Sequence, residues 1–143
     1  MINDMYSNYS TIKKENSIEQ IIKILEKESE LWLKMNMIPR DCFQAIKKYS
    51  GYSIEELCQC GISKTTLNKY LYNVHSYEKY KVVRFLLFTN CPPKCSQHLL
   101  NICNCQLNLE KEEDKWIDFV INHYWHDEFE KNMAFLEKNN IKI

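Results

Sequence analysis

Glycine and proline are too scarce in this chain for a fold that depends on many tight turns. Only two glycines and three prolines occur among 143 residues. A sandwich or barrel of short strands needs turn-forming residues at spacings of about eight to twelve positions. The sequence therefore predicts an all-α fold. It also excludes glycine-rich phosphate loops, because Gly51 and Gly61 cannot supply a dinucleotide-binding or P-loop pattern.

The apolar content is sufficient for a packed core but not for a membrane span. Apolar residues make up 45% of the chain and aromatic residues 13%, which argues against wholesale disorder. The longest apolar stretch, residues 82–88, is interrupted by Arg84 and is too short to cross a bilayer. The first ten residues do not have a charged region followed by an apolar one, as a signal peptide has. We therefore expect a soluble cytoplasmic protein with no membrane partner.

Seven cysteines are many for a chain of this length, and an odd number does not fit a secreted disulfide framework. Five potential zinc ligands fall within residues 91–105. However, no CxxC pair occurs, and cysteines two apart on a helix point in nearly opposite directions. We expect reduced cysteines that fill the core, with no metal or cofactor. No pair of residues has catalytic spacing, so an enzyme is not expected. The five residues are Cys91, Cys95, His98, Cys103 and Cys105.

The net charge is zero, but it is unevenly distributed. Residues 1–37 carry a net charge of −1 and residues 85–143 a net charge of −3. Residues 38–84 hold eight basic side chains against four acidic ones, a net charge of +4. A basic middle between acidic flanks indicates that one segment faces a polyanion.

Apolar residues at helical spacing, together with capping residues, predict eight helical segments after a polar tail of sixteen residues. Capping residues are expected at Ser17, Ser53, Ser63, Ser76, Asn108 and Asp127. Proline begins another helix at Pro92-Pro93. The expected segments are 17–36, 41–49, a very short helix after Ser53, 64–72, 76–90, 92–102, 108–124 and a last helix after Asp127.

Residues 51–73 have the order that is typical of a helix-turn-helix. Ser53 and Glu56 form a capping box for a short helix, Gly61 permits a left-handed turn, and Ser63 caps the next helix. Glu55-Glu56-Leu57 and the run from Gly61 to Leu67 resemble the lambda-repressor-like (Cro/Xre type) DNA-binding domains. The region from Val82 to about Asn132 is similar to the helical C-terminal extension of some bacterial Xre-type regulators.

The chain departs from the family pattern in its first short helix. The stretch from Ser53 to Gly61 is one residue shorter than is usual, and Leu57 stands where a small residue normally lets the two helices approach.

The resemblance implies that the 64–72 helix enters the major groove of double-stranded DNA. Residues on its outer face would then contact bases, and residues near its ends would contact phosphates. Lys47 and Lys79 would add attraction that does not depend on base sequence. The implied base contacts are Lys64, Thr65, Asn68 and Lys69, and the implied phosphate contacts are Ser63, Thr66, Tyr72 and Asn73.

The sequence thus predicts three parts: a tail and helix (1–37), a helix-turn-helix domain (38–90) and a C-terminal helical extension packed on it (91–143). The function that it favours is a sequence-specific, repressor-type transcriptional regulator from a bacterium. The alternative is an adaptor or antitoxin-like module with a vestigial helix-turn-helix, which would gain support if acidic C-terminal residues covered Lys64 and Lys69. We expect a homodimer formed through the 17–36 helix or the 110–136 pair. We also expect that a protein partner can bind through the C-terminal helices.

Overall fold

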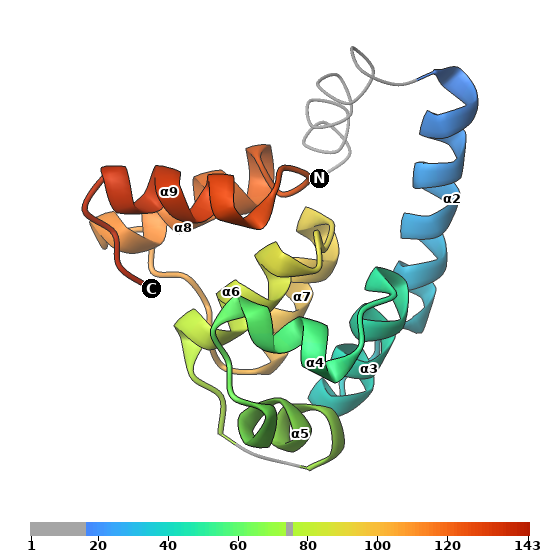
Figure 1. Cartoon of the computed structure of the whole chain (residues 1–143), viewed down its shortest axis with the longest axis horizontal. Coiled ribbons are helices and arrows are strands. Elements are labelled where there is room, and N and C mark those ends of the chain that lie inside the picture. The colour runs from blue at the N-terminus through green and yellow to red at the C-terminus, as the bar shows by residue number, and fades with distance from the viewer. Residues whose placement is uncertain (1–16, 74–75) are drawn as a thin grey trace.

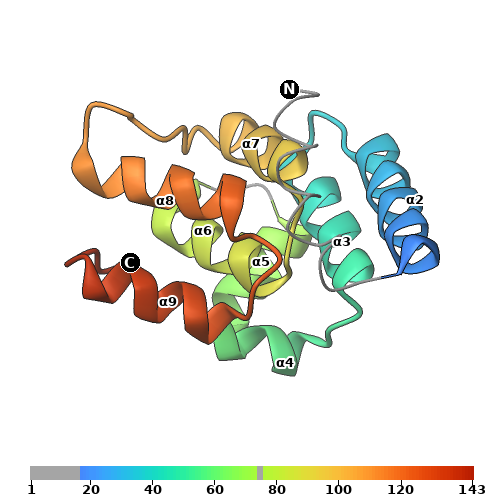
Figure 2. The ribbon, with the colours of Figure 1, turned by 90° about the horizontal axis from the view of Figure 1, so that it is seen from above.

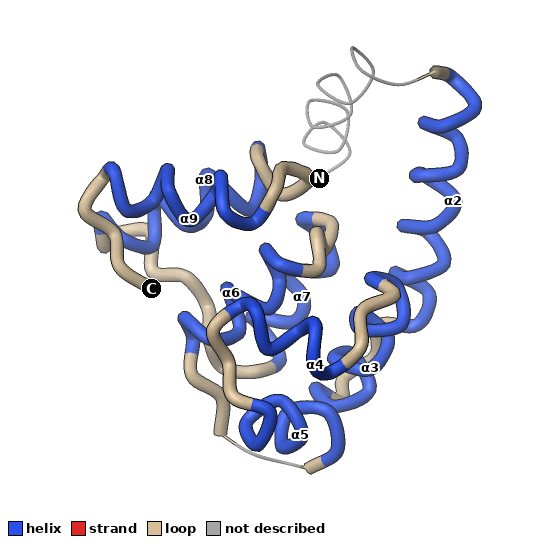
Figure 3. Tube along the Cα trace, in the orientation of Figure 1, coloured by secondary structure: helices blue, strands red, loops and turns tan. Residues whose placement is uncertain are grey.

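The computed structural model describes residues 17–73 and 76–143, and within these ranges the fold is all-α, with eight α-helices and no strands (Figure 1, Figure 3). A 3₁₀ turn, η1, follows the shortest helix directly. The expected polar tail, residues 1–16, lies outside the described residues. The elements are α2 (Ile18–Lys34), α3 (Pro39–Ser50), α4 (Ile54–Leu57), η1 (Cys58–Cys60), α5 (Lys64–Tyr72), α6 (Lys79–Phe88), α7 (Pro93–Ile102), α8 (Glu112–His123) and α9 (Phe129–Lys138).

Serine caps set the starts of three helices as the sequence predicts. Ser17 and Ser53 each form a complete capping box, with Gln20 and Glu56 respectively. The Ser63 hydroxyl accepts the backbone N–H of Thr66 at 3.2 Å. These contacts satisfy N–H groups that have no partner within the helix, so each helix begins where the cap stands.

Three other helices begin later than predicted, and long-range or loop contacts explain the difference. The backbone N–H of Glu78 donates to the Tyr70 hydroxyl at 3.2 Å, which holds the segment after Ser76 against α5. The Asp127 carbonyl accepts the Asn90 side-chain amide at 2.9 Å, so Glu128 becomes the cap of α9.

Asn108 does not cap α8 as expected, because it lies in a turn of the loop before that helix. Its side-chain oxygen accepts the N–H of Glu110 at 3.0 Å, and its own N–H donates to Asp114 at 2.7 Å. Helix α8 therefore begins at Glu112.

Helix α6 is the centre of the core. Six of its ten residues are buried, including Phe85, and it packs on η1, α7 and α9. One hydrophobic cluster runs from Leu31 in α2 to Ile141 after α9. The predicted helix-turn-helix region and the C-terminal helices thus share a core.

The views agree that α2 lies at one edge of the molecule, beside α3, and that the α8–α9 pair lies at the opposite side (Figure 1, Figure 2). Helix α5 stands at the bottom of Figure 1, away from α8 and α9. It packs on α3 and α4.

Candidate nucleic-acid interface

The inner face of α5 fixes the orientation of this helix. Leu67, Tyr70 and Leu71 are buried, and α5 packs on α3 and α4 through this face. The Gln44 side chain of α3 donates to the Leu71 carbonyl at 2.5 Å, near the end of α5. Apolar burial along one side and a hydrogen bond near the end thus hold α5 as a rigid element.

The turn before α5 depends on Gly61 and Arg84. Gly61 has a φ of +93°, a left-handed conformation that favours glycine. Arg84 of α6 donates to the Cys60 carbonyl at 3.0 Å and also to the Ile143 carbonyl. A Cβ atom on Gly61 would lie 2.7 Å from the Arg84 Nη1 atom. The turn therefore favours glycine for its backbone conformation, and a Cβ atom there would also displace the end of the Arg84 side chain.

The four residues expected to contact bases share one face of α5. At 100° per residue, Lys64, Thr65, Asn68 and Lys69 fall within an arc of about 140°. Three of the four side chains are exposed, and Asn68 is half-buried. The exposed ring of Tyr72 continues the same face at the C-terminal end. The residues that the Cro/Xre resemblance implied as base contacts therefore lie together on one face of α5.

The residues expected to contact phosphates divide into two groups. The Ser63 hydroxyl caps α5 and also donates to the Thr66 hydroxyl at 3.0 Å, and Thr66 is half-buried. Both hydroxyls therefore make hydrogen bonds at the N-terminus of α5 itself. The first backbone N–H groups of α5 still point outward. Tyr72 and Asn73 are exposed at the other end.

An acidic side chain lies beside the basic end of this face. The Lys64 ammonium is 3.3 Å from a Glu55 carboxylate oxygen, and both side chains are well exposed. The pKa of Glu55 is lowered, first by a hydrogen bond from its own backbone N–H and then by Lys64. Glu55 therefore remains a carboxylate and offsets the charge of Lys64, whereas Lys69 has no ion-pair partner among the described residues.

Several other cations of the basic middle are bound within the fold. The Lys79 ammonium lies 2.7 Å from the carboxylate of Asp114, which is fully buried in α8. Lys79 therefore joins α6 to α8, and its expected role as a freely acting cation is wrong. Arg84 binds backbone carbonyls, and Lys81 pairs with Glu78 at 2.9 Å.

The cysteines are unpaired thiols, six of them buried and Cys58 half-buried. Burial raises the pKa of the Cys60 thiol to about 11 and that of Cys103 to about 12. Such thiols stay protonated at neutral pH and are poor nucleophiles and poor metal ligands. Among residues 17–73 and 76–143, no three His, Cys, Asp or Glu side chains gather in a way that could hold a metal ion.

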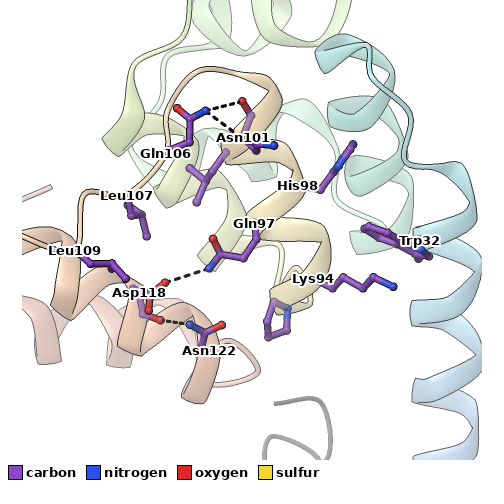
Figure 4. Close-up of a pocket in the computed structure, with 12 residues that line it drawn as sticks. Trp32, Lys94, Gln97, His98, Asn101, Gln106, Leu107, Leu109, Asp118 and Asn122 are labelled. Carbon is purple, nitrogen blue, oxygen red and sulfur yellow. Dashed lines mark hydrogen bonds between the residues drawn. The ribbon is translucent and has the colours of Figure 1, made fainter. Parts of the chain in front are cut away.

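A groove of about 680 Å³ lies between α2, α7 and α8 (Figure 4). Polar groups in it bind each other: Gln97 donates to Asp118 at 3.2 Å, and His98 is 2.6 Å from the Asn36 carbonyl oxygen. The Lys94 ammonium stands 4.0 Å from the centre of the Trp32 ring. These side chains of the groove are therefore engaged in contacts within the protein.

Comparison of the chain with protein-family models, with curated proteins and with solved structures found no match. Within the described part of the chain, no helix has the length and apolar character that a membrane span needs.

Proposed function

We propose that this protein is a sequence-specific DNA-binding transcriptional regulator whose α5 reads the major groove. One observation carries the proposal. A helix capped by Ser63 and held from behind by α3 and α4 presents Lys64, Thr65 and Lys69 to solvent on one face. Lysine donates to guanine O6 and N7, and threonine contacts the thymine methyl group.

The surroundings of α5 also support this proposal. Helix α4, the 3₁₀ turn and α5 follow each other as a helix-turn-helix does. The acidic helix α8 and its neighbour α9 lie on the other side of the molecule (Figure 1), and Lys64, Thr65 and Lys69 are exposed. The adaptor alternative would gain support if acidic C-terminal residues covered Lys64 and Lys69, and both lysines are exposed.

The test begins with selection of bound fragments from random duplex DNA. Lys69→Ala is then expected to weaken binding to the selected site about 5- to 150-fold, equivalent to about 1–3 kcal/mol, and to relax base preference at one position. Lys138→Ala on α9 is the matched control, because it removes the same exposed charge far from α5. It should change affinity for the selected site less than about threefold.

Equal binding of the wild-type chain to selected and scrambled duplexes would contradict the proposal. Equal affinities of the Lys69→Ala and Lys138→Ala variants for the selected duplex would also contradict it. Circular dichroism of each variant shows that a loss of binding is not a loss of folding.

A second candidate function, a protein-binding module with a vestigial helix-turn-helix, is favoured by the position of Glu55. This carboxylate pairs with Lys64 and lies at the front of the basic face, where it would repel a phosphate. The adaptor function predicts weak DNA binding without base preference, and indifference to the loss of Lys69. The same measurements therefore separate the two functions.

A further inference from the structure

Helix α2 is held on the rest of the protein by a small contact. Only two of its 17 residues have buried side chains, Glu28 and Leu31. The helix packs on α3 and α7, and its N-terminal half extends beyond the neighbouring helices as an arm (Figure 1). An element with so few buried contacts is one that opens before the rest of a structure unfolds.

One of the two buried side chains of α2 is a carboxyl group without a partner. Glu28 is 5% exposed, and its Oε1 atom has no hydrogen-bond partner among the described residues. A buried carboxylate in such a place is strongly unfavourable, whereas the neutral acid is tolerated. Burial therefore raises the pKa of Glu28 from 4.5 to about 8.

The titratable groups that face Glu28 from α3 and α7 do not compensate a negative charge. Tyr49 of α3 and Cys91, in the loop before α7, interact with it electrostatically, and Cys95 of α7 lies beside them. Burial raises the pKa of Tyr49 and that of the Cys91 thiol well above their usual values, so both groups are uncharged at neutral pH. A Glu28 carboxylate would therefore be an unpaired charge inside the contact.

The cations beside this contact bind other groups. The Lys27 ammonium of α2 lies 4.6 Å from the centre of the Tyr49 ring, and the Lys94 ammonium of α7 lies 4.0 Å from the centre of the Trp32 ring. Glu28 has no ion-pair partner among the described residues. The docked position of α2, packed on α3 and α7, is thus compatible with the protonated acid only.

The turn after α2 provides a fixed point about which the helix can move. The Asn36 carbonyl oxygen lies 2.6 Å from the His98 Nε2 atom and accepts the Cys42 thiol at 3.2 Å. The Asn36 side chain donates to Asp41 at 3.0 Å. These contacts hold Asn36 on α3 and α7, while Met35 between it and α2 has an extended backbone. Rotation at Met35 can therefore move α2 without disturbing the other helices.

We propose that α2 opens from α3 and α7 as a local unit, and that loss of the Glu28 proton drives this opening. In the open state the carboxylate reaches water, so its pKa returns to the ordinary value. The open state then binds fewer protons than the docked state between about pH 4.5 and 8, and opening becomes more favourable as the pH rises through this range. The equilibrium constant for opening should rise about tenfold per pH unit, on the order of 10³-fold in total.

Opening has two structural consequences. It separates Trp32 from Lys94 and removes one wall of the groove between α2, α7 and α8. A helix of this length is only marginally stable alone in water, so the open α2 also loses backbone hydrogen bonds. The amides of α2 therefore exchange with solvent when the helix opens, which makes the opening measurable.

Hydrogen–deuterium exchange of the full chain from pH 5 to 9 tests the proposal. Protection factors, corrected for the intrinsic pH dependence of exchange, are compared for the α2 and α6 peptides. In the wild type, α2 should be less protected than α6, and its protection should fall about tenfold per pH unit from pH 5 to 8. Glu28→Gln should abolish this slope, because the amide does not titrate.

Two further variants separate titration from packing. Glu26→Gln is the matched control, since it removes an exposed carboxylate of the same helix and should keep the wild-type slope. Leu31→Val weakens the only other buried contact of α2 by one methylene group. It should lower α2 protection about fivefold at each pH and leave the slope unchanged. Circular dichroism checks that each variant is folded.

Protection of α2 that does not change with pH in the wild type would overturn the proposal. A Glu28→Gln slope equal to that of the wild type would overturn it as well. Equal protection of α2 and α6 at every pH would show that α2 opens only when the whole protein unfolds. None of these measurements involves DNA, so the opening of α2 and the proposed function can fail separately.

Discussion

Glu28 occupies an environment that ordinarily excludes a carboxylate. Its side chain is only 5% exposed, and its Oε1 atom has no hydrogen-bond partner among the described residues. Burial raises the pKa of Glu28 from 4.5 to about 8. The folded protein therefore keeps this group protonated at neutral pH, whereas the unfolded chain loses the proton above about pH 4.5.

Glu28→Gln should stabilise the protein at neutral and alkaline pH. For the wild type, the unfolded state releases a proton between about pH 4.5 and 8 while the folded state keeps it, so this residue lowers stability as the pH rises through that range. The substitution should raise the free energy of unfolding by on the order of 4 kcal/mol at pH 8 and change it little below pH 4.

Urea unfolding at several pH values and one fixed protein concentration measures this effect. Glu137→Gln is the matched control, since Glu137 is exposed on α9 and its loss should alter stability by less than about 0.5 kcal/mol at every pH. A Glu28→Gln variant with a pH profile identical to the wild type would show that Glu28 is ionised in the fold.

At the scale of elements, the turn between α4 and α5 extends a first helix that the resemblance to Cro/Xre-type domains led us to expect to be one residue short. Helix α4 has four residues and continues as the 3₁₀ turn Cys58–Cys60. A 3₁₀ turn rises about 2.0 Å per residue instead of 1.5 Å, which recovers part of the missing length. Leu57 is fully buried at this junction and fills the space between the helices.

The two glycines provide a matched pair that tests the contact between this turn and α6. Both have positive φ angles, but Gly51 has open space around its Cα, whereas Gly61 faces the Arg84 guanidinium. Gly51→Ala should destabilise the protein by about 1 kcal/mol and Gly61→Ala by about 2–3 kcal/mol, because the latter also disturbs the Arg84 hydrogen bonds.

The excess cost of Gly61→Ala should disappear when Arg84 is replaced. In an Arg84→Ala chain, Gly51→Ala and Gly61→Ala should lower the free energy of unfolding by about the same amount. A double-mutant cycle measured by urea unfolding tests this. An excess that persists without Arg84 would show that backbone conformation alone explains the role of Gly61.

At the scale of the whole molecule, five of the eight basic side chains of residues 38–84 have partners within the protein, and three of these five are in exposed ion pairs. Lys79, Lys81 and Arg84 bind groups of the protein itself. Lys47, Lys48 and Lys69 have no ion-pair partner among the described residues. The attraction to a DNA backbone should therefore be modest.

The salt dependence of DNA binding should reflect this small number of free cations. The slope of log K against log salt should have a magnitude below about 4 for each copy bound. Glu55→Gln should release Lys64, strengthen binding to all duplexes and steepen the slope by about 1. Glu56→Gln is the matched control, because Glu56 is an exposed neighbour on α4 with no lysine partner among the described residues, and glutamine can keep its capping-box contact with Ser53. A slope unchanged by Glu55→Gln would mean that the Lys64–Glu55 pair does not face the bound DNA.

Much of the secondary structure and the outer face of α5 could be predicted from the sequence, because both depend on neighbours a few residues apart. The caps at Ser17, Ser53 and Ser63 act over three residues. The face of α5 follows from helical spacing alone. The expected starts after Ser76 and Asp127 failed because the Tyr70 and Asn90 contacts that move them come from other elements.

The sequence by itself determined the all-α fold, the capped helices and which side of α5 faces outward. Only the tertiary structure decided which cations remain free, since the contact between Lys79 and Asp114 spans 35 positions and that between Lys64 and Glu55 spans nine. It also decided that Ile18 and Leu33 of α2 remain exposed. The physical reason is that caps and helical spacing are local, whereas ion pairing and burial depend on how distant segments pack together.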